Sequence, residues 1–311
     1  MQQLSYFPNF LPINNTEREV YERIVQSFDV YSDFNFNSVL SWDTNNTHAV
    51  SIHNNNIVLL LNDYITQEPF LTILGEEKLN ESIDTLINFC AQNSLNKAVQ
   101  LVPECVASKL DTRKFYISED INNFDYILST KNISCYKGNQ YKSKRRAAKK
   151  CADSYNITTQ ILQNPTEIEK TTSKITQLLD ECANIKLQLN KDADIELEKR
   201  ATINMVNAGM GNPNIIITLA CIDEKLVGFS IDEILPRRQA LSHYFRTLPN
   251  IMGLSEFLNQ QVASYLLNHD VINWNWEQDL GIETLRDMKN SYRPIFKQKK
   301  YTVRLAEDVN N

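Results

Sequence analysis

The segment Val271–Arg304 constrains the fold more than any other part of this chain. Val271–Trp276 has the apolar and aromatic composition of a strand, and the polar turn after it leads into a short helix. Pro294 ends that helix, and a second strand is predicted from Ile295 to Leu305. In α/β sheets ligands bind at the carboxyl ends of strands. Three polar residues occupy that position here: Glu277, Gln278 and Asp279.

Helical and strand periodicities upstream of this segment predict a complete element order for the second half. They indicate a strand over 155–162, helices over 166–189 and 193–208, strands over 214–222, 226–235 and 239–248, and a helix over 254–267. With the closing segment, the order is β-α-α-β-β-β-α-β-α-β. This is the order of the GNAT acyltransferase fold.

The first half follows a shorter version of the same order, with a helix over 77–92 and a strand over 124–128 that we expect to close it. We therefore predict an α+β chain of two tandem GNAT-like domains with mixed sheets. The predicted boundaries are 1–136 for the N-terminal domain, 137–153 for a basic linker helix and 154–311 for the C-terminal domain.

Composition excludes several classes of protein. The six cysteines are scattered without a CxxC pair, so we expect neither a zinc site nor a disulfide framework, and no metal. Free thiols are typical of a reducing, cytoplasmic location. No signal peptide and no membrane span are predicted, because no apolar run approaches the ~20 residues that a span requires. Neither GxGxxG nor a P-loop is present.

Charge is concentrated in one place. The net charge is −6, yet seven basic residues and no acidic one lie between Lys137 and Lys150. This pattern indicates a localised anionic partner. Lys144, Arg145 and Arg146 fan around one helix, and with Arg293 they are candidates for binding donor phosphates. Alternatively, the helix is a solvated one that pairs with acidic residues such as Asp192, Asp194 or Glu196.

Acyl transfer on such a fold requires a base for the attacking group and a site for the donor. Candidate bases are Glu233, Glu277 and Asp279; the alternatives are a solvent-facing strand position, a solvated side chain and a helix cap, respectively. His243 is a candidate base or acceptor-binding group, or else a core histidine. Tyr292 is a candidate proton donor to the leaving group, or else a packed ring.

The donor's phosphates in the GNAT fold lie at the N-terminus of the helix after the central strands, where free N–H groups and the helix dipole favour anions. The corresponding residues here are Met252, Gly253 and Leu254. Gly253 alone remains of the usual glycine-rich loop.

Three stretches of sequence resemble the C-terminal domain of bacterial phosphatidylglycerol lysyltransferases and its stand-alone relatives. They are EDINNFDY from Glu119, KGNQYKSKRR from Lys137, and EQDLGI from Glu277 with Leu285, Lys289, Ser291, Tyr292 and Pro294. The resemblance implies two tandem GNAT-like domains similar to Fem-type aminoacyltransferases. It also implies transfer of an aminoacyl group from aminoacyl-tRNA to a lipid or small-molecule acceptor.

Two other functions stay open at this point: an acyl-CoA-dependent N-acetyltransferase and a non-catalytic binding module. For either kind of transferase the donor, aminoacyl-tRNA or acyl-CoA, is a substrate and not a tightly bound cofactor. The expected partner is accordingly tRNA or CoA. A peripheral contact with anionic lipid is also compatible with the resemblance.

Overall fold

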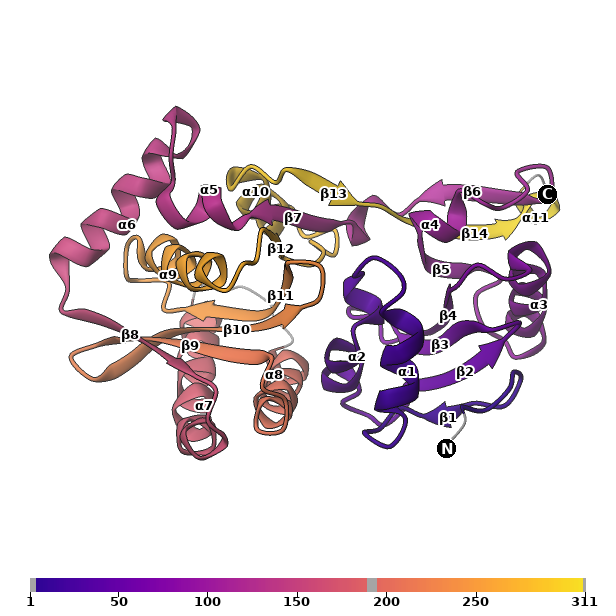
Figure 1. Cartoon of the computed structure of the whole chain (residues 1–311), viewed down its shortest axis with the longest axis horizontal. Coiled ribbons are helices and arrows are strands. Elements are labelled where there is room, and N and C mark those ends of the chain that lie inside the picture. The colour runs from indigo at the N-terminus through magenta and orange to yellow at the C-terminus, as the bar shows by residue number, and fades with distance from the viewer. Residues whose placement is uncertain (1–3, 189–194, 310–311) are drawn as a thin grey trace. The chain divides into compact units, whose positions relative to one another are not determined.

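The computed structural model describes residues 4–188 and 195–309, and the chain folds into two compact units (Figure 1). The first unit contains the chain up to Asp125, Gln278–Arg286 and the chain from Lys297 onward. The second contains Tyr126–Glu277 and Asp287–Phe296. Each unit is built on a seven-stranded sheet with parallel and antiparallel pairs. The predicted α+β class with mixed sheets is therefore confirmed.

The sheet of the first unit has the strand order β1-β2-β3-β4-β5-β14-β6. The C-terminal strand β14 pairs antiparallel with both β5 and β6, so it lies inside the sheet. The strands are β1 (Leu11–Pro12), β2 (Ala49–His53), β3 (Asn56–Asn62), β4 (Pro69–Leu74), β5 (Val99–Pro103), β6 (Phe115–Glu119) and β14 (Lys300–Leu305). The helices are α1 (Arg18–Val25), η1 (Ser32–Phe34), α2 (Phe36–Trp42), α3 (Leu79–Gln92), α4 (Glu104–Ala107), η2 (Ile121–Asn123) and α11 (Ala306–Val309).

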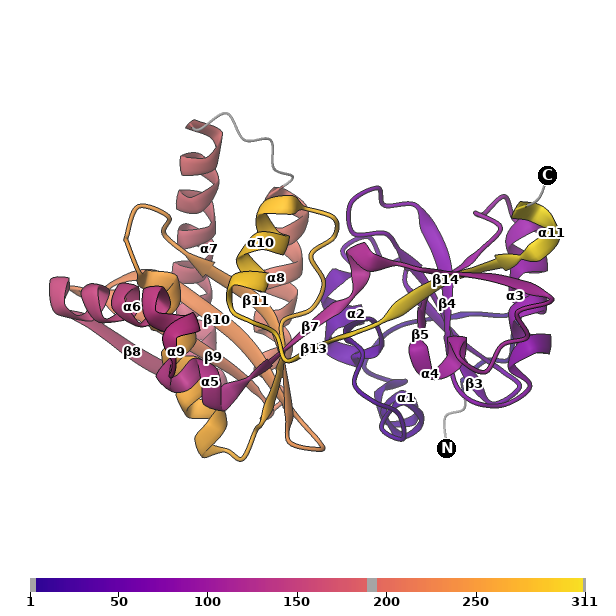
Figure 2. The same cartoon turned by 90° about the horizontal axis from the view of Figure 1, so that it is seen from above.

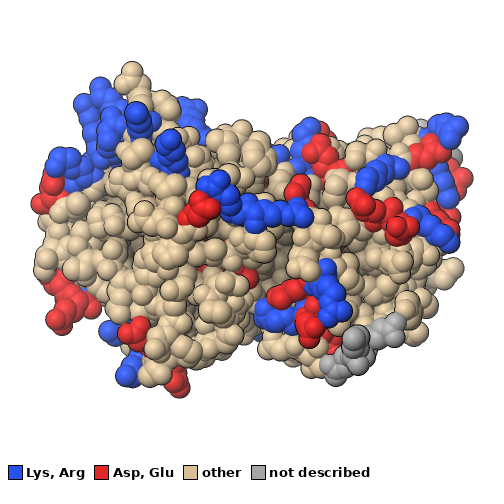
Figure 3. Space-filling view, in the orientation of Figure 1, with Lys and Arg blue, Asp and Glu red and all other residues tan. Residues whose placement is uncertain are grey.

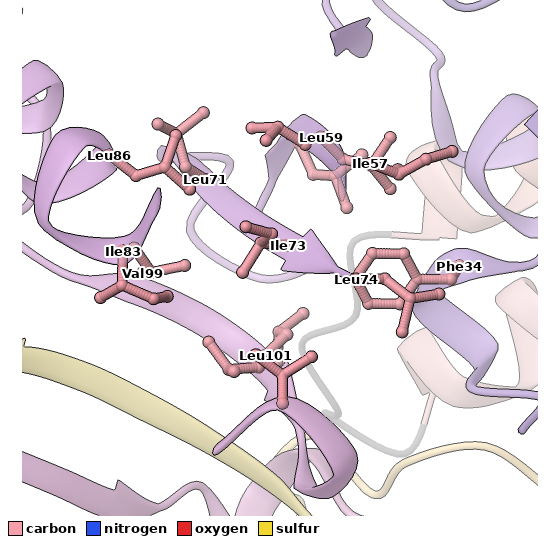
Figure 4. Packing of buried hydrophobic residues seen from close by; sticks show 14 of the residues in the cluster. Phe34, Ile57, Leu59, Leu71, Ile73, Leu74, Ile83, Leu86, Val99 and Leu101 are labelled. Carbon is pink, nitrogen blue, oxygen red and sulfur yellow. The ribbon is translucent and has the colours of Figure 1, made fainter. Parts of the chain in front are cut away.

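The core of the first unit forms where α3 packs on the sheet. Ile83 and Leu86 lie one turn apart on α3 and face buried strand residues such as Leu71 and Val99 (Figure 4). This helical spacing of apolar residues is what the sequence predicted. A Leu86→Ala change would remove a fully buried side chain, a type of change that costs about 2–5 kcal/mol.

A buried charged cluster joins distant parts of the first unit's sequence. Lys300 on β14 is completely buried and forms ion pairs with Asp33 and with Asp125, the latter at 2.7 Å. Ser32 donates to Asp125 at 2.8 Å and to Gln278 at 3.0 Å. Replacing Lys300 by an apolar residue would leave the two buried carboxylates without its compensating charge, which is strongly destabilising.

The second unit has the strand order β13-β7-β12-β11-β10-β9-β8. Figures 1 and 2 show α9 on one face of this sheet and α7 and α8 on the other. The strands are β7 (Asp125–Ser129), β8 (Ile157–Leu162), β9 (Ile215–Ile222), β10 (Lys225–Leu235), β11 (Gln239–Thr247), β12 (Asn273–Asn275) and β13 (Phe296–Gln298). The helices are α5 (Thr130–Cys135), η3 (Asn139–Tyr141), α6 (Lys142–Ser154), α7 (Pro165–Gln188), α8 (Ile195–Gly209) and α9 (Leu254–Asn268). α10 (Glu283–Ser291) is shared, with its residues up to Arg286 in the first unit and those from Asp287 in the second.

Two strand predictions are wrong in a related way. The single strand predicted over 295–305 is divided into β13 and β14, which belong to different sheets. The strand predicted over 124–128 corresponds to β7, which pairs with β12 of the second sheet and does not close the first one. Pairing partners far away in sequence decide both cases, and local residue patterns carry no information about them.

The central strands β11 and β12 of the second unit are parallel but pair over a short distance. Asn273, Trp274 and Asn275 pair with Gln239, Ala240 and Leu241. Beyond this point β11 continues to Thr247 paired with β10 but not with β12. Within the described residues, no helix combines the length and the apolar character needed to cross a bilayer.

Candidate functional site

His243 lies at a β-bulge just beyond the point where β11 and β12 separate. Ile231 pairs with Tyr244 and Asp232 with Ser242, so His243 is the extra residue of β11 at this register shift. A bulge bends the strand and turns the extra side chain in a new direction, and bulges are frequent next to active sites. The side chain of His243 is 1% exposed.

Two carboxylates lie on either side of the imidazole. His243 Nε2 is 3.1 Å from Glu233 Oε2, and His243 Nδ1 is 3.5 Å from Glu277 Oε1. Both Glu233 and Glu277 are candidate bases from the sequence, so the structure brings three of the five predicted catalytic residues together. Glu233 is 4% exposed, and the alternative of a solvent-facing position is therefore wrong. Glu277 is the more accessible carboxylate, with a side chain 16% exposed.

The two carboxylates keep the imidazole protonated. Burial lowers the pKa of His243, but the hydrogen bonds and charges of Glu233 and Glu277 outweigh it and raise this pKa to about 9. At neutral pH the imidazole of His243 is therefore protonated. Among the described residues, no group of three or more His, Cys, Asp or Glu side chains is arranged to hold a metal ion.

Neighbouring side chains hold Glu233 and Asp232 in separate environments, as expected for consecutive residues of a strand. Asn212 Nδ2 donates to Glu233 Oε1 at 3.4 Å. Asp232 instead accepts hydrogen bonds from Trp274 Nε1 at 2.9 Å and from Ser230 Oγ at 2.6 Å. Burial raises the pKa of Asp232 to about 6 despite these donors.

Asp279 belongs to the first unit and has a different environment. It is fully buried and accepts a hydrogen bond from Gly281 N at 2.9 Å. It also forms a bidentate ion pair with Arg286, at 2.9 and 3.0 Å. These bonds stabilise the turn before α10. Helix capping was the alternative interpretation, and the observed role is close to it. This geometry favours a structural role for Asp279 over that of a base.

Tyr292 lies in a buried aromatic layer of the second unit. Its hydroxyl accepts from Asn259 Nδ2 at 3.2 Å, and its ring meets that of Trp276 edge-on, with centroids 4.7 Å apart. Burial raises its pKa, so the hydroxyl stays protonated at neutral pH. The Lys144 ammonium lies 3.9 Å from the ring centroid. These contacts agree with the alternative interpretation, in which the ring of Tyr292 packs among other side chains.

The three adjacent basic residues of α6 have unequal roles. Lys144 is turned inward and pairs with Glu256 at 3.2 Å. Arg145 donates to the carbonyls of Tyr136 and Gly138, whereas Arg146 is exposed. Figure 3 shows Lys and Arg side chains gathered over α6. The predicted acidic partners Asp192 and Asp194 lie outside the described residues.

Exposed cations on α6 form one stripe, which we call the α6 basic face. Helical spacing places its members on the side opposite the buried Ala148 and Cys151. They are Lys142, Arg146, Lys149 and Lys150. Arg293, the other predicted phosphate ligand, is exposed and follows α10 with a φ of 56°.

The N-terminus of α9, predicted to bind donor phosphates, packs against α6. A Cβ at Gly253 would lie 2.2 Å from the Ala147 carbonyl oxygen, so the two backbones are in close contact. Leu254 is fully buried and Met252 is 65% exposed. Glu256 places a carboxylate in the first turn of the helix. A carboxylate and a carbonyl oxygen at this position oppose the binding of an anion.

The sequence analysis assigned no site role to three residues that surround the candidate site, Asn212, Asn275 and Lys289, although Lys289 belongs to the stretch that carries the family resemblance. Asn275 Oδ1 accepts from Glu277 N at 2.7 Å, and Lys289 Nζ donates to the Trp276 carbonyl at 2.5 Å. A signal for Asn275 was present, because it is a polar residue between two tryptophans in a strand predicted to be buried. No comparable signal marks Asn212.

Comparison with known proteins identifies relatives. The family model described as "Phosphatidylglycerol lysyltransferase, C-terminal" matches residues 27–304. No curated protein matches the sequence.

Among solved structures, the fold is similar to that of a conserved protein of unknown function from Bacteroides thetaiotaomicron VPI-5482, with a TM-score of 0.80 at 20% identity over 95% of this chain and 99% of the other. It is also similar to L-PGS from Bacillus licheniformis, with a TM-score of 0.61 at 11% identity over 97% and 94% of the two chains. FemX has a TM-score of 0.58 at 9% identity over 97% and 98%. These likenesses confirm the predicted tandem GNAT-like fold.

Proposed function

Because the chain belongs to the family of phosphatidylglycerol lysyltransferase C-terminal domains, we propose that it transfers an aminoacyl group from aminoacyl-tRNA to a lipid or small-molecule acceptor. Membership of this family supports a transferase at the level of the family. The observation that carries the finer proposal is the imidazolium of His243 between Glu233 and Glu277, at the bulge beyond the separation of β11 and β12.

Glu277 is the proton acceptor in this proposal because it is the most accessible of the three groups. As the acceptor's oxygen or nitrogen forms a bond to the ester carbonyl carbon, its proton passes to the Glu277 carboxylate. The bond between that carbon and the ribose oxygen of the tRNA then breaks, and the proton passes to the ribose oxygen. His243 orients Glu277 and balances the second carboxylate, which Glu233 supplies.

Two features, one on α6 and one where α9 packs against it, favour a tRNA donor over acyl-CoA. The α6 basic face presents four cations to solvent, and cations in a row are suited to the phosphate backbone of a nucleic acid. The N-terminus of α9, where CoA phosphates would bind, instead contacts the Ala147 carbonyl and carries Glu256. Lys144 pairs with Glu256, so it supports the packing of α6.

A transfer assay with a Glu277→Gln variant tests the proposal. Total tRNA charged with radiolabelled amino acids is incubated with the protein and either a bacterial lipid extract or a pool of small amines. We expect label to move to one acceptor pool, and Glu277→Gln to slow this transfer at least about 100-fold with unchanged tRNA affinity. Glu224→Gln, an exposed change in the β9–β10 turn, is the matched control. Full activity of Glu277→Gln would refute the role of Glu277.

Thermal unfolding separates this function from the two others. A ligand that binds only the native state raises the melting temperature by mass action. A rise with acetyl-CoA and none with aminoacyl-tRNA would indicate an acyl-CoA-dependent enzyme. A rise with aminoacyl-tRNA, combined with no transfer by the unmodified protein to either acceptor pool, would indicate a binding module.

A further inference from the structure

The backbone conformation of Glu277 is unusual and requires support. Its φ is 55°, in the left-handed region, which residues other than glycine adopt rarely and at a cost of about 1–2 kcal/mol. The conformation turns the chain sharply where it leaves β12. Such outliers persist only when their surroundings hold them, and they are concentrated at functional sites.

Two side chains of the second unit hold the peptide group that precedes Glu277. Lys289 Nζ donates to the carbonyl of Trp276 at 2.5 Å, on one side of this peptide group. On the other side, the N–H of Glu277 donates to Asn275 Oδ1 at 2.7 Å. A peptide group is planar, so fixing both its oxygen and its hydrogen fixes its orientation.

Adjacent backbone bonds complete this support. Trp276 N donates to the Tyr126 carbonyl at 2.9 Å, and Tyr126 N donates to the Glu277 carbonyl at 3.1 Å. Rotation of the Trp276–Glu277 peptide would break the bonds of Lys289 and Asn275. It would also move the Glu277 side chain away from His243 Nδ1.

Burial of Lys289 at this position costs free energy. It is only 7% exposed, and removing an ammonium group from water carries a penalty of several kcal/mol. Its ammonium lies 5.7 Å from the Tyr126 ring centroid, a weak additional interaction. A methionine would fill the same volume without that penalty. The presence of a lysine therefore suggests a role that an apolar side chain cannot perform.

We propose that Lys289 and Asn275 are positioning residues, which orient the Trp276–Glu277 peptide so that the Glu277 carboxylate reaches His243. The inference rests on the proposed function for its catalytic meaning. The geometric claim itself can be tested without any substrate.

NMR titration of the imidazole of His243 reports the position of Glu277 directly. The protein has four histidines, so ¹⁵N-histidine labelling gives few signals, and a His243→Asn variant assigns this one. In Lys289→Met we expect the pKa of His243 to fall by at least about 1, because a nearby opposite charge is withdrawn. Loss of the Lys289 charge alone would raise that pKa. The sign of the change therefore separates displacement of Glu277 from simple electrostatics.

Thr130→Val is the matched control. Thr130 Oγ1 donates to the carbonyl of Val271 at 2.6 Å, so this variant also removes a buried bond from a side chain to a backbone carbonyl near β12. It should lower the stability without changing the pKa of His243. Lys289→Arg retains a charged donor and should restore most of the pKa that Lys289→Met loses.

Asn275→Ala provides a second route if Lys289→Met does not fold, and it should lower the same pKa. An unchanged or raised pKa of His243 in folded Lys289→Met, or in Asn275→Ala, would overturn the inference. The proposed function would then still stand or fall by the transfer assay. Conversely, a lowered pKa in a protein without transfer activity would support the positioning role alone.

Discussion

His243 links the candidate site to the stability of the protein at the scale of single residues. Its pKa is about 9 when folded and about 6.5 in an unfolded chain. The folded protein therefore holds this proton more tightly, and the resulting stabilisation, on the order of 3 kcal/mol, is complete below about pH 6.5. As the pH rises toward 9 the stabilisation is lost. We expect the free energy of unfolding to fall between pH 6.5 and 9, measured by urea denaturation.

His243→Asn should remove most of this pH dependence, because the variant has no imidazolium between Glu233 and Glu277. His269→Asn, which removes an exposed histidine, should retain it. Asp232 does not disturb the comparison, since its raised pKa of about 6 places its own effect at lower pH. Equal pH profiles for the natural protein and His243→Asn would contradict the raised pKa.

Helix α6 shows how one element divides its residues between packing and binding. Lys144 faces inward toward Glu256 and Tyr292, whereas the α6 basic face is turned to solvent. We expect the triple variant Lys142→Ala, Arg146→Ala, Lys150→Ala to bind tRNA more weakly. The slope of log affinity against log salt should become shallower by about 1 for each phosphate that the variant no longer neutralises. Filter binding at several salt concentrations measures both quantities.

A triple variant with the same loss of charge elsewhere in the second unit is the control: Lys170→Ala, Lys174→Ala, Lys225→Ala. All three of these lysines are exposed; Lys170 and Lys174 lie on α7, and Lys225 is the first residue of β10. This variant should retain the salt slope if binding is localised. Equal losses of affinity in both triple variants would indicate attraction to overall charge, and would argue against a docking surface on α6.

Each sheet of the whole molecule contains strands from separated parts of the sequence. β14, near the C-terminus, lies between β5 and β6, and β7 lies between β13 and β12. Division of the chain after residue 136 would therefore remove β14 from the first sheet and β7 from the second. Unpaired strand edges inside a sheet leave many backbone groups unsatisfied. We expect fragments 1–136 and 137–311 to fail to fold when produced separately.

Two-dimensional NMR spectra of the two fragments measure this directly. Narrow signal dispersion for each alone, with native-like dispersion when both are expressed together, is the expected result. A well-dispersed spectrum from fragment 1–136 alone would show that β14 is dispensable. The boundaries 1–136, 137–153 and 154–311 would then describe independent domains. Until such a test they stay a prediction.

Local sequence patterns were sufficient to predict the order and type of most elements and the location of the polar cluster after β12. These features depend on periodicity and turn residues within a few turns of chain, and such local information is present in any one segment. The family resemblance likewise rests on short runs of residues around Glu119, Lys137 and Glu277.

Which residues of that cluster face the candidate site depends on how the whole chain packs. Glu277 and Asp279 are two positions apart, yet one lies beside His243 and the other beside Arg286. Long-range packing also determines the bulge at His243, the partners of β7 and β14, and the role of Lys289. The physical reason is that ladder pairing and buried ion pairs form between segments far apart in the chain. Their geometry is set when the whole core packs, and no local window of sequence contains it.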